Sequence, residues 1–309
     1  MIENIAVVGS INIDHVLKVA MFPKLGETII AKSYELIEGG KGANQAASMG
    51  KLGMNVQMFG KVGDDIYGKL VMESLKKCNV NIENVIIDKT NSTGSAFIIV
   101  DKVGNNTIVV TPGANGTLSL KDVDSFEMKI LKNDIIVLQM EIPEAIVSHI
   151  VNMAKESNKI VILNLAPALN MKNNILNKVN FLILNESELE FLTKVKCSIQ
   201  NIKLAIKKIR EFYHNKLIIT LGLDGAAYSI SNNDFKIIPT FDVATVDKTG
   251  AGDAFIGGFT LGLVANKNIE DCVAMGNAAG AFSVTILGAQ SSLPYKNELE
   301  DFLKLKEKG

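Results

Sequence analysis

The sequence predicts an α/β fold with a central, mostly parallel sheet flanked by helices, and with a small β-sheet lid. Short runs that are apolar on both faces recur along the chain, as in strands covered on both sides. Amphipathic segments lie between these runs, which gives a βαβα alternation. Two regions of the N-terminal half, residues 10–38 and 93–111, depart from the alternation and lack partner helices.

The elements follow one another in a regular order. We expect strands at Ile5–Gly9, Val56–Gly60, Ile135–Leu138, Ile160–Leu163, Phe181–Leu184 and Leu217–Thr220. We expect helices at Lys41–Lys51, Gly68–Lys77, Pro143–Lys155, Ile202–Phe212, Ala254–Val264, Asn268–Ile286 and Lys296–Lys308. In the second exceptional region, Ser95–Asp101 and Thr107–Thr111 flank a turn at Val103–Asn106, which predicts a hairpin. Residues 10–38 and 93–111 together are expected to form the lid.

Domain organisation and partners are constrained by composition. The sequence has no internal repeat and no linker, so we predict one domain over residues 1–309. A net charge of −1 and the absence of Trp argue against nucleic acid as a partner. No apolar stretch approaches the roughly 20 residues that span a membrane. Three scattered cysteines and no signal-like start indicate reduced thiols in a cytoplasmic protein.

The most informative segment is Asp247–Asp253, with the sequence DKTGAGD, which leads into the apolar pattern of Ala254–Val264. Glycines at a helix start let backbone N–H groups face a ligand, and the helix end adds partial positive charge. The segment therefore predicts an anion site, with phosphate as the expected anion.

Asp253 stands out in this setting because a carboxylate would repel the bound anion. A catalytic role resolves the conflict, since an ionised aspartate can accept the proton of an attacking hydroxyl during phosphoryl transfer. The alternative is that Asp253 only caps the first helical turn.

Two more loops carry candidate ligand contacts. Gly39–Gln45, GGKGANQ, is a glycine turn that enters a helix, and it is either a ligand-contacting turn or an ordinary loop. It is not a Walker loop, and Gly250-Ala251-Gly252 does not complete GxGxxG. Asn12 and Asp14 follow the first strand on one face and could hold sugar hydroxyls, or could close the strand as a turn. His15 is expected to be structural.

The chain resembles the ribokinase branch of the carbohydrate kinase family. The resemblance is carried by these motifs, taken in order, together with Asn185-Glu186-Ser187-Glu188. The resemblance covers nearly the whole chain. It implies transfer of the ATP γ-phosphoryl group to the primary hydroxyl of D-ribose, giving D-ribose 5-phosphate, with Asp253 as general base and with Gly250, Ala251 and Gly252 as the anion hole. Acceptor positions matching those of the family are Asn12, Asp14, Gly40, Lys41, Asn44, Glu141 and Asp247.

The resemblance also implies cofactor sites. Positions that match ATP contacts are Asn185, Thr220, Gly222, Gly225 and Asn277, and Glu188 matches a residue that orders the water shell of Mg²⁺. Positions that match a site for the activating K⁺ ion are Asp247, Thr249, Ser283, Ile286, Gly288 and Ser292. Lys248 departs from the small residue of many relatives and leaves acceptor preference and cation affinity open. A homodimer through the β-lid is implied as well.

Other functions remain alternatives at this point. The acceptor could instead be 2-deoxyribose, fructose or a nucleoside, because the sequence does not measure the room under the lid. A non-catalytic sugar-binding regulator is disfavoured because Asp253 and the glycines are present. A nicotinamide-dependent dehydrogenase would need GxGxxG after the first strand, where Gly9-Ser10-Ile11-Asn12 stands instead.

Overall fold

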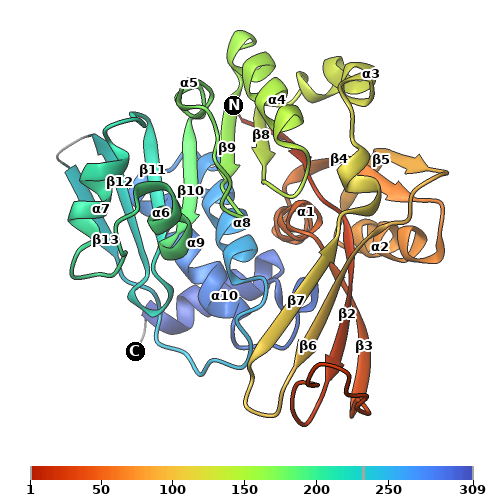
Figure 1. The fold of residues 1–309 in the computed structure, drawn as a ribbon. Coiled ribbons are helices and arrows are strands. Elements are labelled where there is room, and N and C mark those ends of the chain that lie inside the picture. Colours follow the sequence, from red (N-terminus) through yellow and green to blue (C-terminus); the bar gives the residue numbers. More distant parts are fainter. Residues whose placement is uncertain (1, 232–233, 308–309) are drawn as a thin grey trace.

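The fold of this computed structural model, which describes residues 2–231 and 234–307, contains two separate sheets (Figure 1). The larger has nine described strands in the order β13-β12-β11-β10-β9-β8-β1-β4-β5. Its pairs are parallel except β11–β12 and β12–β13, which are antiparallel. The predicted α/β class with a mostly parallel sheet is confirmed. The strands of this sheet are β1 (Asn4–Val8), β4 (Asn55–Gly63), β5 (Val80–Asp88), β8 (Ile135–Leu138), β9 (Ile160–Asn164), β10 (Phe181–Asn185), β11 (Lys216–Thr220), β12 (Ala226–Ser231) and β13 (Asp234–Ile238).

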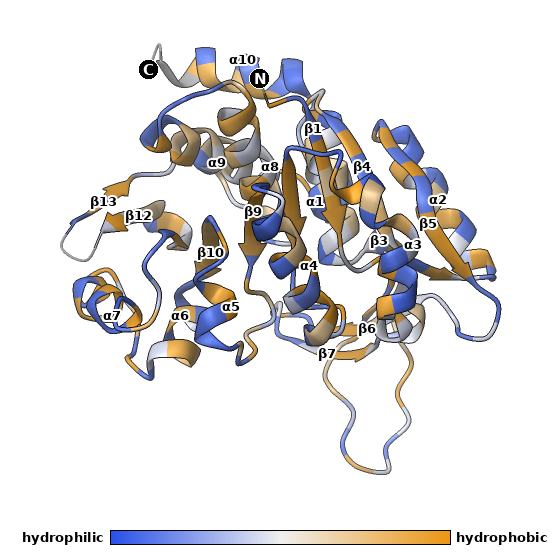
Figure 2. Cartoon of the chain, turned by 90° about the horizontal axis from the view of Figure 1, so that it is seen from above, coloured by the Kyte–Doolittle hydropathy of each residue, from blue (hydrophilic) through white to orange (hydrophobic). Residues whose placement is uncertain are grey.

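Helices cover both faces of the large sheet, so its central strands are apolar throughout, as Figure 2 shows. One face is covered by α1 (Lys41–Lys51), α2 (Ile66–Lys77), α8 (Ala251–Val264), α9 (Ile269–Ser283) and α10 (Lys296–Glu307). The other is covered by α3 (Leu120–Ile130), α4 (Glu144–Glu156), α5 (Asn173–Leu176), α6 (Glu186–Thr193) and α7 (Ile202–Ile209). Within the described ranges, no helix combines the length and apolar character needed to cross a lipid bilayer.

The small sheet has the order β3-β2-β6-β7 and projects from the main body (Figure 1). Its strands are β2 (Asn12–Lys18), β3 (Ser33–Gly39), β6 (Gly94–Val100) and β7 (Asn106–Thr111). The predicted hairpin is β6–β7, and the separate small sheet is confirmed. Residues 19–32 of the predicted region contain no strand.

Several element boundaries differ from the sequence prediction. The helix expected at Ile202–Phe212 ends at Ile209, and the helix expected at Asn268–Ile286 spans Ile269–Ser283 because Asn268 is its N-cap. Helix α8 begins at Ala251, three residues before the expected start. The final helix matches up to Glu307, and Lys308 lies outside the described residues.

Helix α1 packs closely on α8, and small residues make this possible. A Cβ added at Gly257 would collide with the Ser48 hydroxyl and stand 2.8 Å from Ser48 Cβ. A Cβ at Gly42 would stand 2.7 Å from the Gly9–Ser10 backbone. The first turn of α1 is therefore held between the end of β1 and the start of α8, where the sequence placed its candidate residues.

Candidate active site

The start of α8 has the form expected of an anion site. Gly250 is the N-cap residue with φ of 79°, a left-handed conformation that glycine adopts without strain. The space beside Gly252 is open, since no atom lies within 4 Å of the position a Cβ would take. A ligand can therefore approach the N–H groups of the first turn, where the helix end is partially positive.

Asp253, the third residue of α8, is buried at 7% exposure and hydrogen-bonds to α1. Its Oδ2 accepts from Asn44 Nδ2 at 3.1 Å, and its Oδ1 accepts from Gln45 Nε2 at 2.9 Å. The helix-capping alternative receives no support from these bonds. Burial raises the pKa of Asp253, against the opposing effects of Lys41 and of the Gln45 and Asn44 hydrogen bonds, and Glu141 adds to the rise.

The acceptor-side residues meet where the small sheet joins the main body. Glu141 accepts from Ser10 Oγ at 2.6 Å and from the Lys41 N–H at 3.0 Å. Asn12 is buried, and its Oδ1 accepts from Asn115 Nδ2 at 2.7 Å. Asn115 also bonds both backbone groups of Ile11, although no sequence motif marks Asn115 as part of the site. Gly39 lies against the Asp14 carboxylate, and a side chain there would displace it.

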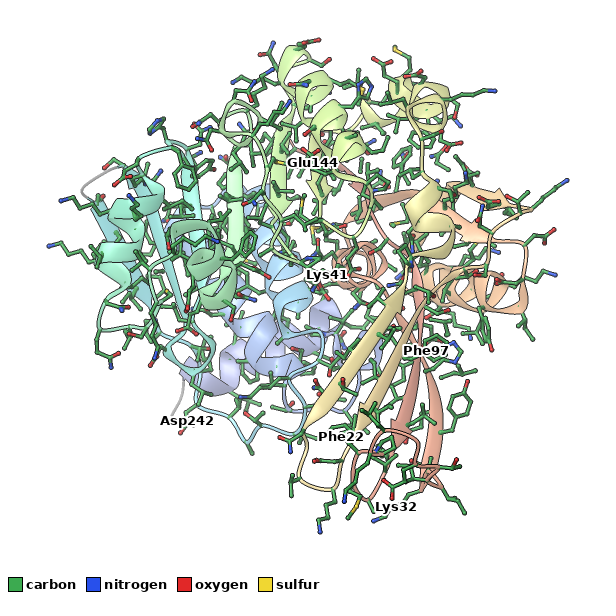
Figure 3. All side chains as sticks on the ribbon, viewed as in Figure 1. Phe22, Lys32, Lys41, Phe97, Glu144 and Asp242 are labelled. Atoms are coloured by element: carbon green, nitrogen blue, oxygen red, sulfur yellow. The ribbon has the colours of Figure 1, made fainter. Side chains whose placement is uncertain are left out.

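Four carboxylates surround the amine of Lys41, which Figure 3 labels near the centre of the molecule. Burial lowers the pKa of Lys41, but the charges of Asp253, Glu141, Glu188 and Asp14 outweigh it and raise the pKa overall. Burial, Glu141 and Asp253 together raise the pKa of Asp14 to about 7, opposed by Lys41. The site is thus rich in acid, with one lysine at its centre.

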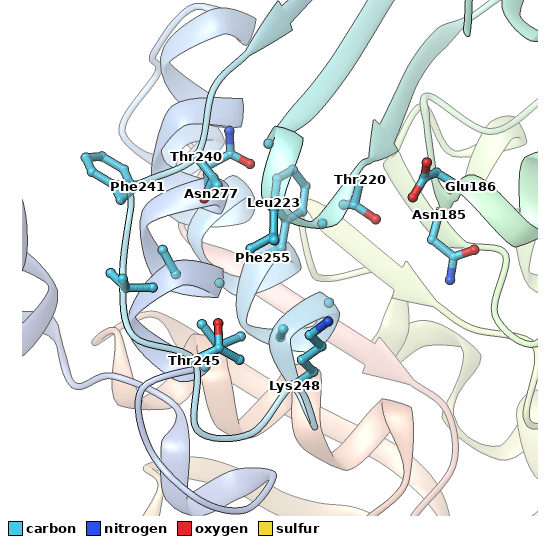
Figure 4. A pocket seen from close by; sticks show the side chains of 18 of the residues that line it. Asn185, Glu186, Thr220, Leu223, Thr240, Phe241, Thr245, Lys248, Phe255 and Asn277 are labelled. Carbon is cyan, nitrogen blue, oxygen red and sulfur yellow. The ribbon is translucent and has the colours of Figure 1, made fainter. Parts of the chain in front are cut away.

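Two cavities meet at the start of α8. The smaller, of about 210 Å³, is lined by Asp253, Lys41, Glu188, Asn164 and Gly252 among others. The larger, of about 420 Å³, is lined by the five predicted nucleotide contacts, namely Asn185, Thr220, Gly222, Gly225 and Asn277 (Figure 4). Lys248 and Gly252 border both. The small polar cavity and the larger cleft therefore share the anion site as a common boundary.

The wall of the larger cavity includes residues that the sequence analysis did not find. They come mainly from the segment between β13 and α8: Thr240, Phe241, Val243 and Thr245, with Phe255 from α8. Asn277 holds this segment by donating to the Ile238 and Pro239 carbonyls at 2.8 and 3.2 Å. Residues 240–245 carry no glycine motif, which begins only at Asp247, so nothing in the sequence marked this stretch.

Glu188 and Asn185 form a reciprocal cap at the start of α6. Asn185 Oδ1 accepts from the Glu188 N–H at 2.9 Å, and Glu188 Oε2 accepts from the Asn185 N–H at 2.8 Å. Glu188 is buried at 7% exposure and is therefore not a surface residue of α6. Burial raises the pKa of Glu188, opposed by the Asn185 hydrogen bond and by Lys41.

The residues predicted for a monovalent cation divide into two groups. Asp247 accepts from the Thr249 N–H and hydroxyl and from the Gly288 N–H, at 2.9, 2.7 and 2.9 Å. These bonds lower the pKa of Asp247 even though burial acts to raise it. Ser283 and Ser292 instead donate to the carbonyls of Gly280 and Ala289, and Ile286 is exposed. Among the described residues, no group of three acidic, His or Cys side chains is placed to hold a metal.

A glycine-bent helix end beside a buried carboxylate suits phosphoryl transfer, in which positioning and charge stabilisation do most of the work. Comparison with known proteins agrees with that class, since the family described as pfkB family carbohydrate kinase matches residues 2–296. The chain belongs to this family.

Individual relatives span almost the entire chain. It is 36% identical over 308 residues to ribokinase of Haemophilus influenzae, covering 98% of this chain and 99% of that protein. It is also 36% identical over 306 residues to deoxyribokinase of Salmonella typhi, covering 98% and 100%. The solved structure of Arabidopsis thaliana ribokinase complexed with ribose and ATP superposes with a TM-score of 0.90, at 32% identity, over 98% and 99% of the two chains.

The raised pKa of Asp14 predicts a pH-dependent stability. Between the ordinary value of 3.8 and about 7, the folded protein keeps a proton on Asp14 that the unfolded chain releases. This contribution is fully present below 3.8 and is lost as the pH rises through 7. We expect Asp14→Asn to gain stability over the wild type between pH 4 and pH 8, by on the order of 2–4 kcal/mol.

Urea unfolding of both proteins at several pH values measures this difference. Asp64→Asn, at an exposed aspartate, is the matched control for the change of side chain. A difference between Asp14→Asn and wild type that does not vary with pH would contradict the electrostatic account of this carboxylate.

Proposed function

We propose that this protein transfers the γ-phosphoryl group of ATP to the primary hydroxyl of D-ribose, giving D-ribose 5-phosphate and ADP. The observation that carries the proposal is the position of Asp253, which is buried at the helix end and lines the small polar cavity next to the larger cleft. The names of the ribokinase relatives, one of them solved with ribose and ATP, support the choice of substrates.

In the proposed reaction Asp253 is the general base. The hydroxyl proton passes to its carboxylate, the hydroxyl oxygen bonds to the γ-phosphorus, and the bond to the β–γ bridging oxygen breaks to release ADP. The N–H groups of Gly250, Ala251 and Gly252 stabilise charge on the phosphoryl oxygens. A raised pKa helps, because a more basic carboxylate accepts the proton more readily.

The acceptor is proposed to be a neutral polyol held by Asn12, Asp14, Gly40, Lys41, Asn44, Glu141 and Asp247. Carboxylates accept hydrogen bonds from vicinal hydroxyls, and Glu141 lies close enough to Asp14 to help raise the pKa of Asp14. A sugar that already carried a phosphate would be repelled by these acids. The acidic surroundings of Lys41 therefore favour a free sugar.

The nucleotide is proposed to occupy the larger cavity, with Asn185, Thr220, Gly222, Gly225 and Asn277 as its contacts. The Glu188 carboxylate reaches the small cavity beside Asp253, a donor suited to water molecules around Mg²⁺. When bound to the phosphates, Mg²⁺ would neutralise their charge. The K⁺ site is proposed around Asp247, Thr249 and Gly288, with Ser283, Ile286 and Ser292 contributing backbone oxygens.

The small sheet is proposed to be a lid belonging to the single domain. It carries Asn12 and Asp14 on β2, next to the acceptor cavity, so closure over the sugar would exclude water from the reacting groups.

The kinase proposal is tested by ADP release with ATP, MgCl₂ and a panel of ribose, 2-deoxyribose, fructose and adenosine, each with and without KCl. We expect ribose to give the highest kcat/KM, since a site matched to a hydroxyl disfavours the analogue that lacks it. A higher value for 2-deoxyribose would replace ribose by the acceptor named for the Salmonella relative. Background ADP release with every acceptor would overturn the kinase proposal.

Asp253→Asn should lower kcat with ribose by about 10²–10⁴-fold, because the amide retains the shape but does not accept the proton. ATP affinity, measured by equilibrium titration, should stay within about threefold. In the wild type, kcat/KM should fall as the pH drops through the raised pKa of Asp253. Wild-type turnover in the variant would remove the proposed base.

Lys248 is proposed to contact phosphate oxygens of ATP. It borders both cavities beside the start of α8, and Figure 4 shows it at the end of the larger cavity away from Thr240. In the described part of the chain, no acidic side chain forms an ion pair with its amine. This cation is thus available to an anion at the helix end.

Lys248→Thr should raise KM for ATP about tenfold, equivalent to about 1.4 kcal/mol, the scale of one charge-assisted hydrogen bond. KM for ribose should change little. Lys267→Thr, at an exposed lysine that lines neither cavity, is the matched control. Unchanged ATP kinetics in Lys248→Thr would mean that this side chain points into solvent.

The protein is proposed to form a homodimer through the lid. The β-sheet pairing puts Tyr34, Leu36, Phe97 and Val109 on the face opposite Asp14, where they are 53, 40, 42 and 63% exposed. Every residue of the edge strand β7 is exposed as well. Apolar surface beside an open strand edge suits burial against a second copy.

Sedimentation equilibrium should give a dimer of 33.4 kDa chains for the wild type and a monomer for Val109→Glu. Leu204→Glu, which alters an apolar side chain of similar exposure on α7, should remain dimeric. A monomeric wild type, or a dimeric Val109→Glu, would rule out this interface.

A further inference from the structure

We infer that Gln45, Gln139 and Gln290 are positioning residues that fix the orientation of the Asp253 carboxylate. None of the three lines either cavity, and all are buried, at 0, 0 and 3% exposure. They belong to two chains of side-chain amides that reach Asp253 from opposite sides. The inference rests on the proposed role of Asp253 as the base.

The first chain fixes the orientation of the Gln45 amide. Gln45 Nε2 donates to Asp253 Oδ1 at 2.9 Å and to Asn164 Oδ1 at 3.1 Å, so both of its N–H bonds are used. Gln45 Oε1 accepts from Gln139 Nε2 at 2.7 Å. If Gln45 were flipped, its carbonyl oxygen would face the carboxylate and its N–H groups would face the N–H groups of Gln139.

Gln139 fixes the orientation of the Gln45 amide, but one polar atom of Gln139 is itself left without a hydrogen bond within residues 2–231 and 234–307. Its Oε1 is buried against Gly9 and finds no donor among the described residues. Reversing the Gln139 amide would break its bond to Gln45, because the carbonyl of Gln139 would then face the carbonyl of Gln45. An unmet acceptor on a buried amide is costly, so its presence calls for a specific explanation. Here the donor end sets the direction of the chain that ends at Asp253.

The second chain reaches the other carboxylate oxygen. Asn44 Nδ2 donates to Asp253 Oδ2 at 3.1 Å, and Asn44 Oδ1 accepts from Gln290 Nε2 at 3.3 Å. Gln290 Oε1 accepts from Ser74 Oγ at 3.1 Å, which sets the orientation of that amide in turn. The backbone carbonyl of Gln290 accepts from the buried Lys51 amine at 2.8 Å, which holds the segment in place.

Both chains therefore present N–H groups to Asp253 and place their carbonyl oxygens away from it. Each carboxylate oxygen is held by one amide, so the plane of the carboxylate is fixed relative to the helix end. Both donors also favour the ionised form, which is the form that accepts a proton. A neutral network thus holds the buried Asp253 carboxylate in position, and no described lysine, arginine or histidine forms an ion pair with it.

The test measures the pH dependence of kcat/KM for Gln139→Met and Gln290→Met, each of which removes a terminal amide with little change in volume. We expect the acidic limb to move toward higher pH by about one pH unit in each variant, with a tenfold loss of kcat/KM at low pH. Gln139→Glu, which offers an acceptor to Gln45 and reverses the chain, should show a larger shift. Gln139→Asn keeps an amide on a shorter side chain, so its pH profile should still differ from that of the wild type.

Ser229→Ala is the control for a general loss of stability. Ser229 is buried and hydrogen-bonded to Arg210, away from both chains, so the variant should unfold more readily yet keep the wild-type pH profile. The same profile for Gln139→Met and Gln290→Met as for wild type would overturn the inference. If one variant does not fold, the profile of the other decides the matter, since each chain ends on Asp253 independently.

A double-mutant comparison separates this inference from the proposed base. In an Asp253→Asn background, Gln139→Met should change the residual rate less than twofold, because the group it positions is gone. If Asp253→Asn loses activity and Gln139→Met still lowers its residual rate by the same factor as in the wild type, only the positioning role is overturned. A fully active Asp253→Asn would instead overturn the base itself.

Discussion

The close contact between α1 and α8 is the constraint on which the site depends. Asn44 and Gln45 are consecutive on α1, and they reach both oxygens of a carboxylate more than 200 positions later in the chain only because Gly257 lets the helices approach at Ser48. Gly42 does the same toward the end of β1. A larger residue at either glycine would separate the amides from Asp253, so helix packing and the chemistry of the site share one geometric requirement.

The electrostatics of the site follow from this packing. Asp14, Glu141, Glu188 and Asp253 share one half-buried lysine, Lys41, so the acids outnumber the nearby base. Such a cluster is tolerable because hydrogen bonds from Ser10, Asn44, Gln45 and Asn185 satisfy the carboxylates, and because Asp14 holds its proton more tightly than usual. The start of α8 adds positive potential on the nucleotide side. The charge of the site therefore runs from acidic at the acceptor to positive at the phosphoryl group.

How much could be predicted from the sequence depended on the range of the interactions. Buried parallel strands such as Ile135–Leu138 were evident because a run that is apolar on both faces is a local signal. Strand β5 alternates in burial, and β12 and β13 form an antiparallel pair at the edge of the sheet. None of these three strands has a run that is apolar on both faces. The glycine turns of Gly250 and Gly40 were evident too. Asn115, Gln139 and Gln290 were missed because each acts through partners about 100 or more positions away, which no local pattern records.

The junction between the two sheets explains why an acceptor site can be built there. Asn115 holds Ile11 and Asn12 to the main body, whereas Asp14, two residues further along β2, belongs to the projecting sheet. In the proposed closure, movement of that sheet toward the body would bring Asp14 nearer to Glu141 and Asp253. Repulsion among the three acids would oppose this movement unless a ligand donated hydrogen bonds between them. A polyol supplies such donors from several hydroxyls at once, while water supplies them without fixed geometry. In the proposed function, closure of the lid is therefore coupled to the presence of the sugar by the same carboxylates that bind it.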